Sequence, residues 1–578
     1  MEAIFCRNGT ETPEPVKAVV SGAIPPWLQG TLLRNGPGLF SIGKTSYNHW
    51  FDGLSLIHSF TFKHGDVYYR SKFLRSDTYK KNIAANRIVV SEFGTMVYPD
   101  PCKNIFSKAF TYLLNSIPDF TDNNLVSIIK YGDDYYTSSE INYINQINPV
   151  TLDTIGRVSA NYRNYISLNL ATAHPHYDDE GNTYNMGTAI LAMSGPKYVI
   201  FKVPATTSDI KDNGKTNLAL KNLQQICSIP FRSKLYPSYY HSFGMTQNYI
   251  IFVEQPFKLD IIRLATAYFR RTTWGKCLFY DQDDVTLFHI INRKTGDAVN
   301  TKFYGDALVV FHHINAYEED GHIVFDLISY KDSSLYDLFY IDYMKQEAPK
   351  FTETSKAFSR PVCQRFVIPL NADLKGNPLG KNLVRLEDTS ATAVFQMDGS
   401  LYCTPETLFQ GLELPSINYQ YNGKKYRYFY GSMMDWSPQA NKIAKVDVDT
   451  KTHLEWTEED CYPSEPKFVA SPGAVDEDDG VILSSVVSVN PKKSPFMLVL
   501  DAKTLKEIAR ASIDATVHLD LHGIFIPAEN NGAFMVMFDE NLNKTTKNKQ
   551  RDHFFKIIGL IIGIISLKCF IPKVPYEV

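Results

Sequence analysis

Four histidines are candidates to bind one metal ion, because each has aromatic or apolar neighbours and their spacing is regular. They are His174, His241, His312 and His522. The intervals between them are 67, 71 and 210 residues, and the last is close to three of the first. One histidine per repeated sheet unit, converging on a shared axis, would produce this spacing. Imidazole suits iron, copper, nickel and zinc, and the spacing does not choose among them. Structural histidines in a non-catalytic scaffold are the alternative.

The sequence around His312 predicts the strand that positions it. Two β-rich runs, 307–311 and 322–330, flank an acidic turn at 318–321, which is typical of a hairpin. A second hairpin is predicted over 59–70, where a Gly-Asp turn separates two alternating runs. The first hairpin places His312 and His313 at a strand end.

A short pattern recurs beside apolar strand-like runs: an apolar residue, Asn or Asp, two free positions and Thr. It begins at Ile147, Ile291, Val446 and Leu500. Asn, Asp and Thr side chains hydrogen-bond to turn backbone, which suits a connection between two strands. Four copies indicate a repeated sheet unit, as in a β-propeller.

The composition favours a large β protein and argues against a nucleic-acid partner. The chain has 578 residues, of which 36 are Phe and 35 are Tyr, and these residue types favour strands. The net charge is −3 and the cations are scattered, so no basic stripe is present. The eight cysteines form no CxxC pair, which predicts reduced thiols. Without a secretory signal near the first residues, we expect a cytoplasmic protein, in the cytosol.

Two segments have helical apolar spacing, 104–114 and 259–269, with Lys or Arg at their flanks. They are predicted as core-facing helices or as sites of transient contact with a membrane surface. A charged run at 541–552 reads as a linker to an apolar stretch at 557–567. The apolar stretch has 11 residues, fewer than the roughly 17–25 that a membrane span needs. An interfacial segment, a disordered appendage and a tail anchor remain the alternatives.

Several motifs resemble the carotenoid cleavage oxygenases over residues 14–527. They include LLRNGPG, NHWFDG, PDPCK, TAHPHYD, PSYYHSFG, FHHINAYEEDG, YPSEP and LHGIF. The resemblance implies an all-β fold, a seven-bladed β-propeller with a dome of loops and helices over an axial metal site. The expected organisation is an N-terminal extension at 1–13, one propeller domain at 14–527, and a divergent C-terminal segment at 528–578 with the linker and tail.

The resemblance also implies the roles of the candidate residues. The four histidines match the ligands of one non-haem Fe(II) per chain. The matching carboxylates, which would hold the rings of three histidines, are Glu140, Glu413 and Glu465, with Glu406 as a competitor of Glu413. His176 and His313, next to two of the ligands, would pack or support the ligand rings, and His518 would be structural.

The implied activity is that of a dioxygenase that uses O2 to cleave the central 15,15′ double bond of β-carotene into two all-trans-retinal molecules. Tyr239, Tyr240 and Tyr330 would stabilise positive charge on the polyene, or are plain core aromatics. The alternatives within the family are eccentric 9′,10′ cleavage and retinoid isomerohydrolase activity. Tyr462 stands where central-cleavage members tend to have Trp, so regioselectivity stays open.

Overall fold

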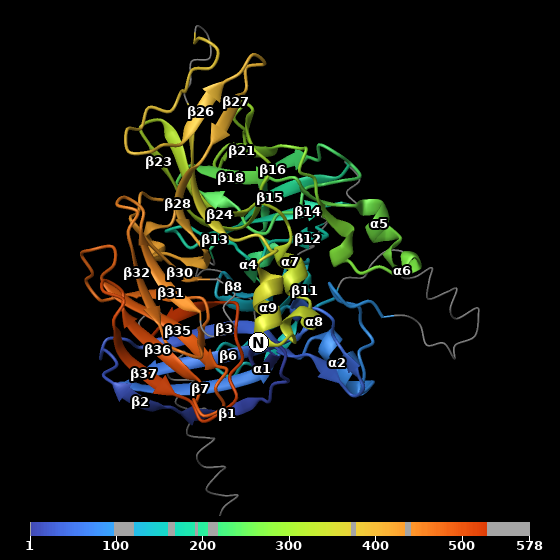
Figure 1. Cartoon of the computed structure of the whole chain (residues 1–578), viewed down its shortest axis with the longest axis vertical. Coiled ribbons are helices and arrows are strands. Elements are labelled where there is room, and N and C mark those ends of the chain that lie inside the picture. The colour runs from blue at the N-terminus through green and yellow to red at the C-terminus, as the bar shows by residue number, and fades with distance from the viewer. Residues whose placement is uncertain are drawn as a thin grey trace, which may run out of the picture.

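Seven sheets of four to six strands surround a common axis and form a seven-bladed β-propeller (Figure 1). The computed structural model describes residues 2–97, 121–159, 168–190, 195–205, 218–370, 377–433 and 441–528. The predicted segments 104–114, 541–552 and 557–567 lie outside the described residues. The prediction of an all-β propeller is confirmed.

Most strands of a blade follow one another along the chain; the exceptions are β38 in blade 1, β2 in blade 7, and β26 and β27 in blade 4. Blades 1 and 2 contain β1 (Thr12–Lys17), β3 (Gly30–Leu39), β6 (Leu54–Lys63), β7 (Asp66–Phe73) and β38 (His522–Pro527), then β8 (Ser127–Tyr131), β9 (Asp134–Ser138), β10 (Tyr143–Ile147) and β11 (Thr154–Ser159). Blade 3 contains β12 (Leu170–Ala171), β13 (His176–Tyr177), β14 (Thr183–Ala189), β15 (Lys197–Val203) and β16 (Gln224–Pro230). Blade 4 contains β17 (Gly244–Met245), β18 (Tyr249–Glu254), β21 (Thr286–Asn292), β22 (Phe303–Gly305), β26 (Thr392–Phe395) and β27 (Leu401–Thr404).

The last three blades complete the ring. Blade 5 contains β23 (Val309–Glu319), β24 (His322–Tyr330), β25 (Val362–Pro369) and β28 (Glu406–Gln410). Blade 6 contains β29 (Leu412–Ser416), β30 (Tyr428–Met433), β31 (Lys442–Asp447) and β32 (His453–Thr457). Blade 7 contains β33 (Cys461–Pro463), β34 (Lys467–Ala470), β35 (Gly480–Ser488), β36 (Phe496–Asp501), β37 (Glu507–Ser512) and β2 (Val19–Gly22).

The two ends of the described chain close the ring together. In blade 1, the late strand β38 pairs with the early strand β3, so that Asn35 lies opposite His522. In blade 7, the early strand β2 pairs with β37. Each closing blade therefore holds strands from both ends, which leaves the ring without a free seam.

The turns form where the sequence predicts them. In all four copies of the short turn pattern, the side-chain oxygen of the Asn or Asp accepts a hydrogen bond from the turn backbone. Asn148, for example, accepts from the N–H groups of Val150 and Thr151. The hairpin of β23 and β24 turns at Asp320 and Gly321, both with positive φ, as a two-residue turn of this kind requires. The early hairpin turns at His64-Gly65, one residue before the predicted Gly-Asp turn.

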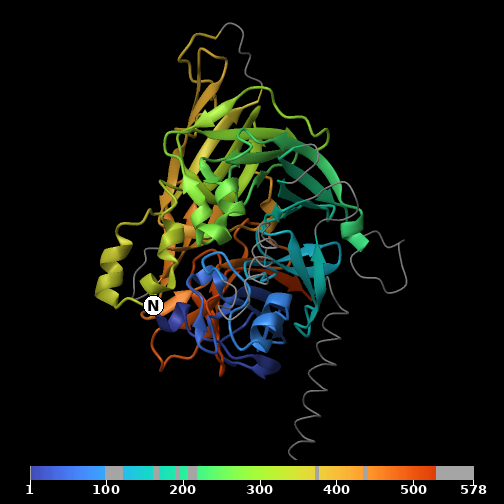
Figure 2. The same ribbon diagram turned by 90° about the vertical axis from the view of Figure 1, so that its right-hand side faces the viewer.

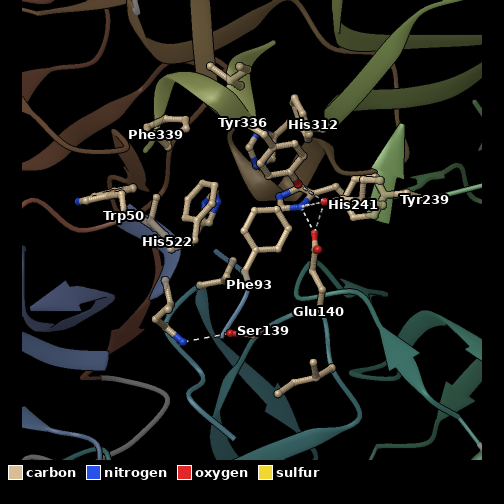
Figure 3. Close-up of a pocket in the computed structure, with 18 of the residues that line it drawn as sticks. Trp50, Phe93, Ser139, Glu140, Tyr239, His241, His312, Tyr336, Phe339 and His522 are labelled. Atoms are coloured by element: carbon tan, nitrogen blue, oxygen red, sulfur yellow. Dashed lines mark hydrogen bonds and ion pairs between the residues drawn. The ribbon is translucent and has the colours of Figure 1, made fainter. Parts of the chain in front are cut away.

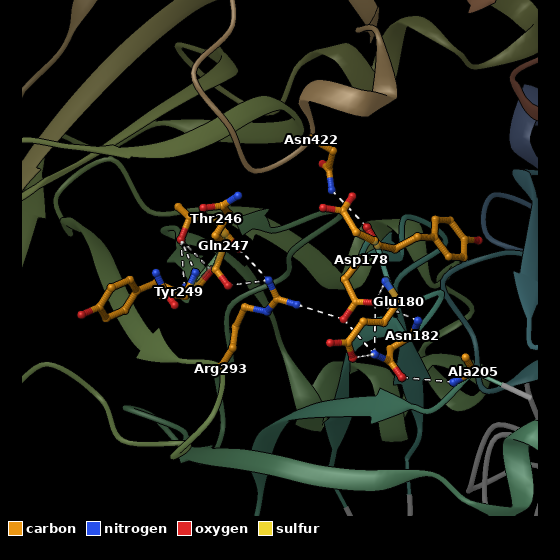
Figure 4. Close-up of polar contacts among 12 residues, drawn as sticks. Asp178, Glu180, Asn182, Ala205, Thr246, Gln247, Tyr249, Arg293 and Asn422 are labelled. Carbon is orange, nitrogen blue, oxygen red and sulfur yellow. Dashed lines mark hydrogen bonds and ion pairs between the residues drawn. The ribbon is translucent and has the colours of Figure 1, made fainter. Parts of the chain in front are cut away.

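Apolar side chains between neighbouring blades form the core. One cluster joins blades 4 and 5 through residues such as Phe288 and Phe325, and another joins blades 6 and 7 through residues such as Ile443 and Leu498. Polar contacts also tie blades together. The Arg293 guanidinium, next to β21, donates to the carbonyl oxygens of Thr246 and Gln247 and to Asp178 of blade 3 (Figure 4).

Short helices and loops lie outside the sheets (Figure 2). The α-helices among the described residues are α1 (Glu2–Phe5), α2 (Asp77–Ala84), α4 (Leu218–Lys221), α5 (Ile261–Ala265), α6 (Ala267–Arg270), α7 (Leu335–Leu338), α8 (Ile341–Met344) and α9 (Ala348–Ser355). Two-stranded pairs complete the described structure: β4 (Ser41–Ile42) with β5 (Thr45–Ser46), and β19 (Phe257–Leu259) with β20 (Leu278–Tyr280).

The predicted helix over 259–269 is only partly correct. The helical segment begins only after β19, at the N-cap Asp260. It is divided into α5 and α6 at Thr266, which is the C-cap of α5 and the N-cap of α6. Among the described residues, no helix is long and apolar enough to cross a membrane.

Candidate metal centre

Four imidazoles meet on the propeller axis. One ring nitrogen from each of His174, His241, His312 and His522 lies within 4.8 Å of the others. The rings of His174 and His522 have centroids 4.6 Å apart, and those of His241 and His312 are 4.8 Å apart. Figure 3 shows three of these rings facing one cavity. The sequence-predicted set is therefore brought together at one point.

The seven blades each contribute one residue to this arrangement. Blades 1, 3, 4 and 5 supply His522 from β38, His174 after β12, His241 before β17 and His312 from β23. The remaining blades supply one glutamate each, from blades 2, 6 and 7: Glu140, Glu413 and Glu465. The histidine intervals follow from this order, since one blade step separates the first three histidines and three steps separate His312 from His522.

Each glutamate holds the Nδ1 of one imidazole. His312 Nδ1 donates to Glu413 at 2.6 Å, and His522 Nδ1 donates to Glu465 at 2.9 Å. His241 Nδ1 donates to Glu140. In each ring a proton on Nδ1 leaves Nε2 with a free lone pair, which is the form a metal ligand needs. No carboxylate among the described residues hydrogen-bonds to His174.

Burial and neighbouring charges set the ionisation of these rings. Burial lowers the pKa of His522 to about 4, although Glu465 opposes this effect. Burial and the other imidazoles hold the pKa of His174 well below its usual range. Burial also lowers the pKa of His312, but the attraction of Glu413 outweighs it and raises that pKa, while lowering the pKa of Glu413. Burial therefore favours the neutral form of His174 and His522, whereas Glu413 favours the protonated form of His312.

The unsatisfied nitrogens fit a cation. His312 Nε2 is buried and has no hydrogen-bond partner among the described residues. His174 Nε2 and His241 Nε2 lie 2.9 Å apart, although Glu140 already holds the proton of His241 on Nδ1. Several lone pairs thus point at one space, where a bound cation would satisfy all of them. The chemistry of the donor set suits a divalent transition metal.

The other candidate histidines face elsewhere. His176 Nε2 donates to the Phe243 carbonyl oxygen, and its Nδ1 lies 3.1 Å from Asn422 Oδ1. His313 Nδ1 lies 3.0 Å from Ser242 Oγ. His518 contacts the Arg7 carbonyl near the start of the chain. Glu406 lies in β28, where it pairs with Lys451 and accepts from Thr389. None of these side chains belongs to the four-histidine cluster.

The three candidate tyrosines occupy different places. Tyr239 and Tyr240 line the cavity above the centre. The hydroxyl of Tyr239 donates to Glu140 at 2.5 Å, and that of Tyr240 contacts Thr188. Tyr330 is fully buried and donates to Glu413 at 2.9 Å. Tyr330 thus fixes a carboxylate and is not one of the residues that line the cavity.

Sequence reasoning missed two supporting residues. Arg34, in β3, donates to Glu465 at 2.6 Å and to Asp520 at 2.6 Å, and so fixes the carboxylate that holds His522. It lies within the LLRNGPG motif, which was the available signal. Tyr336, in α7, has its hydroxyl 2.5 Å from that of Tyr239. No motif in the sequence indicated Tyr336.

An apolar cavity of about 290 Å³ opens onto the centre. Its aromatic walls come from the loops and helices outside the sheets and include Trp50, Phe51, Phe93, Tyr336 and Phe339 (Figure 3). His241, His312 and His522 form part of the same wall. The arrangement can therefore present an apolar molecule to a metal ion.

Comparison with known proteins places this geometry in a family. The family model described as "Retinal pigment epithelial membrane protein" matches residues 5–527. The chain is 58% identical to human "Beta,beta-carotene 15,15'-dioxygenase" over 526 residues, 91% of this chain and 95% of that protein. It is 42% identical to "Carotenoid-cleaving dioxygenase, mitochondrial" from Pongo abelii, covering 89% and 93%. A mutant of Synechocystis apocarotenoid oxygenase has the same fold, with a TM-score of 0.70 and 22% identity over 90% and 97% of the two chains.

Proposed function

The chain belongs to the Retinal pigment epithelial membrane protein family, and from this premise we propose that it cleaves the central 15,15′ double bond of β-carotene with O2. The products are two molecules of all-trans-retinal, and the enzyme class is carotenoid dioxygenase. The observation that carries the proposal is a four-histidine centre open to an apolar cavity, in a chain whose close relatives carry this activity in their names.

Fe(II), one ion per chain, is the metal we propose for the centre, with His174, His241, His312 and His522 as ligands. Imidazoles suit iron as well as copper, nickel and zinc, and the resemblance of the motifs to the carotenoid cleavage oxygenases supports iron. When bound, iron supplies the reaction with O2 that protein side chains cannot perform. The glutamates Glu140, Glu413 and Glu465 keep the ring protons on Nδ1, so that each Nε2 stays available.

The remaining residues bind and orient the substrate. The aromatic walls around Trp50, Phe93 and Phe339 suit a polyene and exclude water from it. Tyr239 presents a ring whose hydroxyl is fixed by Glu140 and Tyr336, so the ring face has one orientation. Such a face stabilises positive charge that develops on the polyene. Tyr240 lines the same cavity, whereas Tyr330 acts through Glu413.

A membrane surface is the second partner we propose. Around α5 and α6, the side chains of Ile262 and Phe269 are 48% and 56% exposed, beside Arg263 and Arg270. Exposed apolar side chains next to cations suit the interface of a bilayer, from which an apolar substrate would be taken up. A cytosolic location belongs to the same proposal, and it is supported by the free thiols of Cys227, Cys277, Cys363, Cys403 and Cys461.

Product analysis tests the proposed reaction. Purified protein loaded with Fe(II) is incubated with β-carotene under air, and the products are separated by chromatography. Central cleavage predicts retinal as the only aldehyde, close to two per β-carotene consumed. Apocarotenals of unequal length would establish the eccentric alternative. Isomerisation of a retinyl ester, without O2 consumption, would establish the isomerohydrolase alternative.

A further inference from the structure

Glu92 is a buried acid in the wall of the apolar cavity. The residue is 2% exposed and lies beside Phe93, which faces the centre in Figure 3. Its Oε1 accepts a hydrogen bond of 2.6 Å from the hydroxyl of Thr121, another lining residue. Among the described residues its Oε2 has no hydrogen-bond partner. Because Glu92 lines the cavity, a ligand or water in the cavity can supply the partner that Oε2 lacks.

The other lining carboxyl groups all have a basic partner. Glu140 holds His241, Glu413 holds His312, and Asp520 pairs with Arg34. Glu92 has no such partner among the described residues, and instead lies near Asp52 and Asp122, two further buried acids. Its position is therefore unexplained by the metal centre.

The environment of Glu92 makes it a hydrogen-bond donor. Burial, and then the charges of Asp52 and Asp122, hold the pKa of this carboxyl well above its usual range, although Thr121 opposes this. This shift favours the neutral carboxylic acid over the carboxylate. Because Oε1 accepts from Thr121, Oε2 is the oxygen that is left to donate when the carboxyl is protonated.

We propose that the Glu92 carboxyl donates a hydrogen bond to the carbonyl oxygen of an aldehyde bound in the cavity. The inference rests on the proposed function, which makes aldehydes from a hydrocarbon. β-Carotene itself has no oxygen and gains nothing from this donor. Two aldehydes fit: the retinal product, and a shortened carotenoid substrate that already bears an aldehyde group. Glu92 is thus a specificity-determining residue, and the centre does not depend on it.

Two variants of similar size isolate the hydrogen bond. Glu92→Gln keeps a neutral donor on the same scaffold, and Glu92→Leu removes it. Binding of all-trans-retinal and of its hydrocarbon counterpart, which lacks the carbonyl, is measured by quenching of tryptophan fluorescence, since Trp50 and Trp274 line the cavity. Compared with Glu92→Gln, Glu92→Leu should raise the Kd of retinal about fivefold to tenfold. The Kd of the hydrocarbon should change less than about twofold. Equal changes for both ligands would overturn the proposal.

Infrared spectroscopy of bound retinal gives a second measurement that does not depend on the leucine variant folding. A hydrogen bond lowers the carbonyl stretching frequency, so the wild type should show a lower frequency than retinal in hydrocarbon solvent. The shift should be smaller in Glu92→Gln, because an amide is a weaker donor than a carboxylic acid. A solvent-like frequency in the wild type, or equal shifts in both proteins, would overturn the proposal.

Kinetics distinguish the two sources of the aldehyde. If the donor holds the product, Glu92→Leu raises the inhibition constant of retinal about fivefold to tenfold during β-carotene turnover. If it holds a substrate, the variant lowers kcat/KM for an apocarotenal by the same factor relative to β-carotene. If neither the inhibition constant nor kcat/KM changes, the proposal is overturned. The binding and infrared experiments need no turnover, so they separate this inference from a failure of the proposed reaction.

Discussion

The Nδ1 of His312 lies 2.6 Å from Oε2 of Glu413, although 101 residues separate them in the chain. The two come from neighbouring blades, and Tyr330 and the backbone N–H of Leu414 also donate to this carboxylate. The ring proton is therefore fixed on Nδ1 and Nε2 faces the axis. In the same way, Glu140 holds Nδ1 of His241 and Glu465 holds Nδ1 of His522.

Loss of this carboxylate should weaken metal binding. Glu413→Gln replaces a charged acceptor with a neutral amide, so we expect about 10-fold to 100-fold lower affinity for Fe(II). Equilibrium dialysis with Fe(II) under anaerobic conditions measures it. Glu406→Gln is the matched control, because Glu406 pairs with Lys451 away from the cluster and should change affinity less than about twofold. Equal losses in both variants would refute the role of Glu413.

Closure of the propeller should depend on a buried cation. Arg34 is fully buried between Glu465 and Asp520, so Arg34→Met removes the cation with which both buried carboxylates form ion pairs. We expect a loss of about 3–5 kcal/mol in the free energy of unfolding, measured by urea titration. Arg427→Met is the control, since the ion pair of Arg427 with Asp447 is at the surface. A loss no larger than in the control would contradict this account.

Asp52 should make the fold less stable as the pH rises. Burial raises its pKa to about 7, although Gly94 and Thr95 donate to it. Between about pH 4 and 7 the unfolded chain has lost this proton while the folded chain keeps it, so stability falls with rising pH. The contribution is up to about 1.4 kcal/mol per pH unit. Asp52→Asn should flatten the dependence of Tm on pH in this window. Parallel curves for the two proteins would show that Asp52 does not titrate as described.

The apolar surface of α6 should contribute to vesicle binding. Phe269→Asp places a charge on the proposed membrane-facing surface, and we expect binding to phospholipid vesicles to fall at least about tenfold in a flotation assay. Met397→Asp is the control, because Met397 is 88% exposed in the turn between β26 and β27, far along the chain. Unchanged binding of the Phe269 variant would remove α6 from the membrane contact.

Local patterns predicted much of the fold. The Asn and Asp turns and the hairpin at Asp320 depend on residues a few positions apart, so the sequence alone indicates them. The repeat of these turns indicated a repeated sheet unit, and the intervals between histidines matched the order of blades. The count of seven blades came from the family resemblance.

Contacts between segments that are distant in the chain could not be predicted from the sequence. The role of Arg34 depends on residues more than 400 positions away, Glu465 and Asp520. Tyr336 reaches Tyr239 only because α7 folds over the cavity. The helix predicted over 259–269 is split because local capping at Asp260 and Thr266 limits each turn, which apolar spacing does not reveal.

The iron content of His312→Ala and His313→Ala proteins tests the central claim most directly. The two residues are neighbours in β23, but Nε2 of His312 faces the cluster, whereas Nδ1 of His313 contacts Ser242. Both variants are loaded with Fe(II), freed of excess metal and analysed by atomic absorption, with circular dichroism to establish folding. The account predicts about one iron per chain in His313→Ala, and a loss of about tenfold or more in His312→Ala. Equal iron in the two folded variants would contradict it.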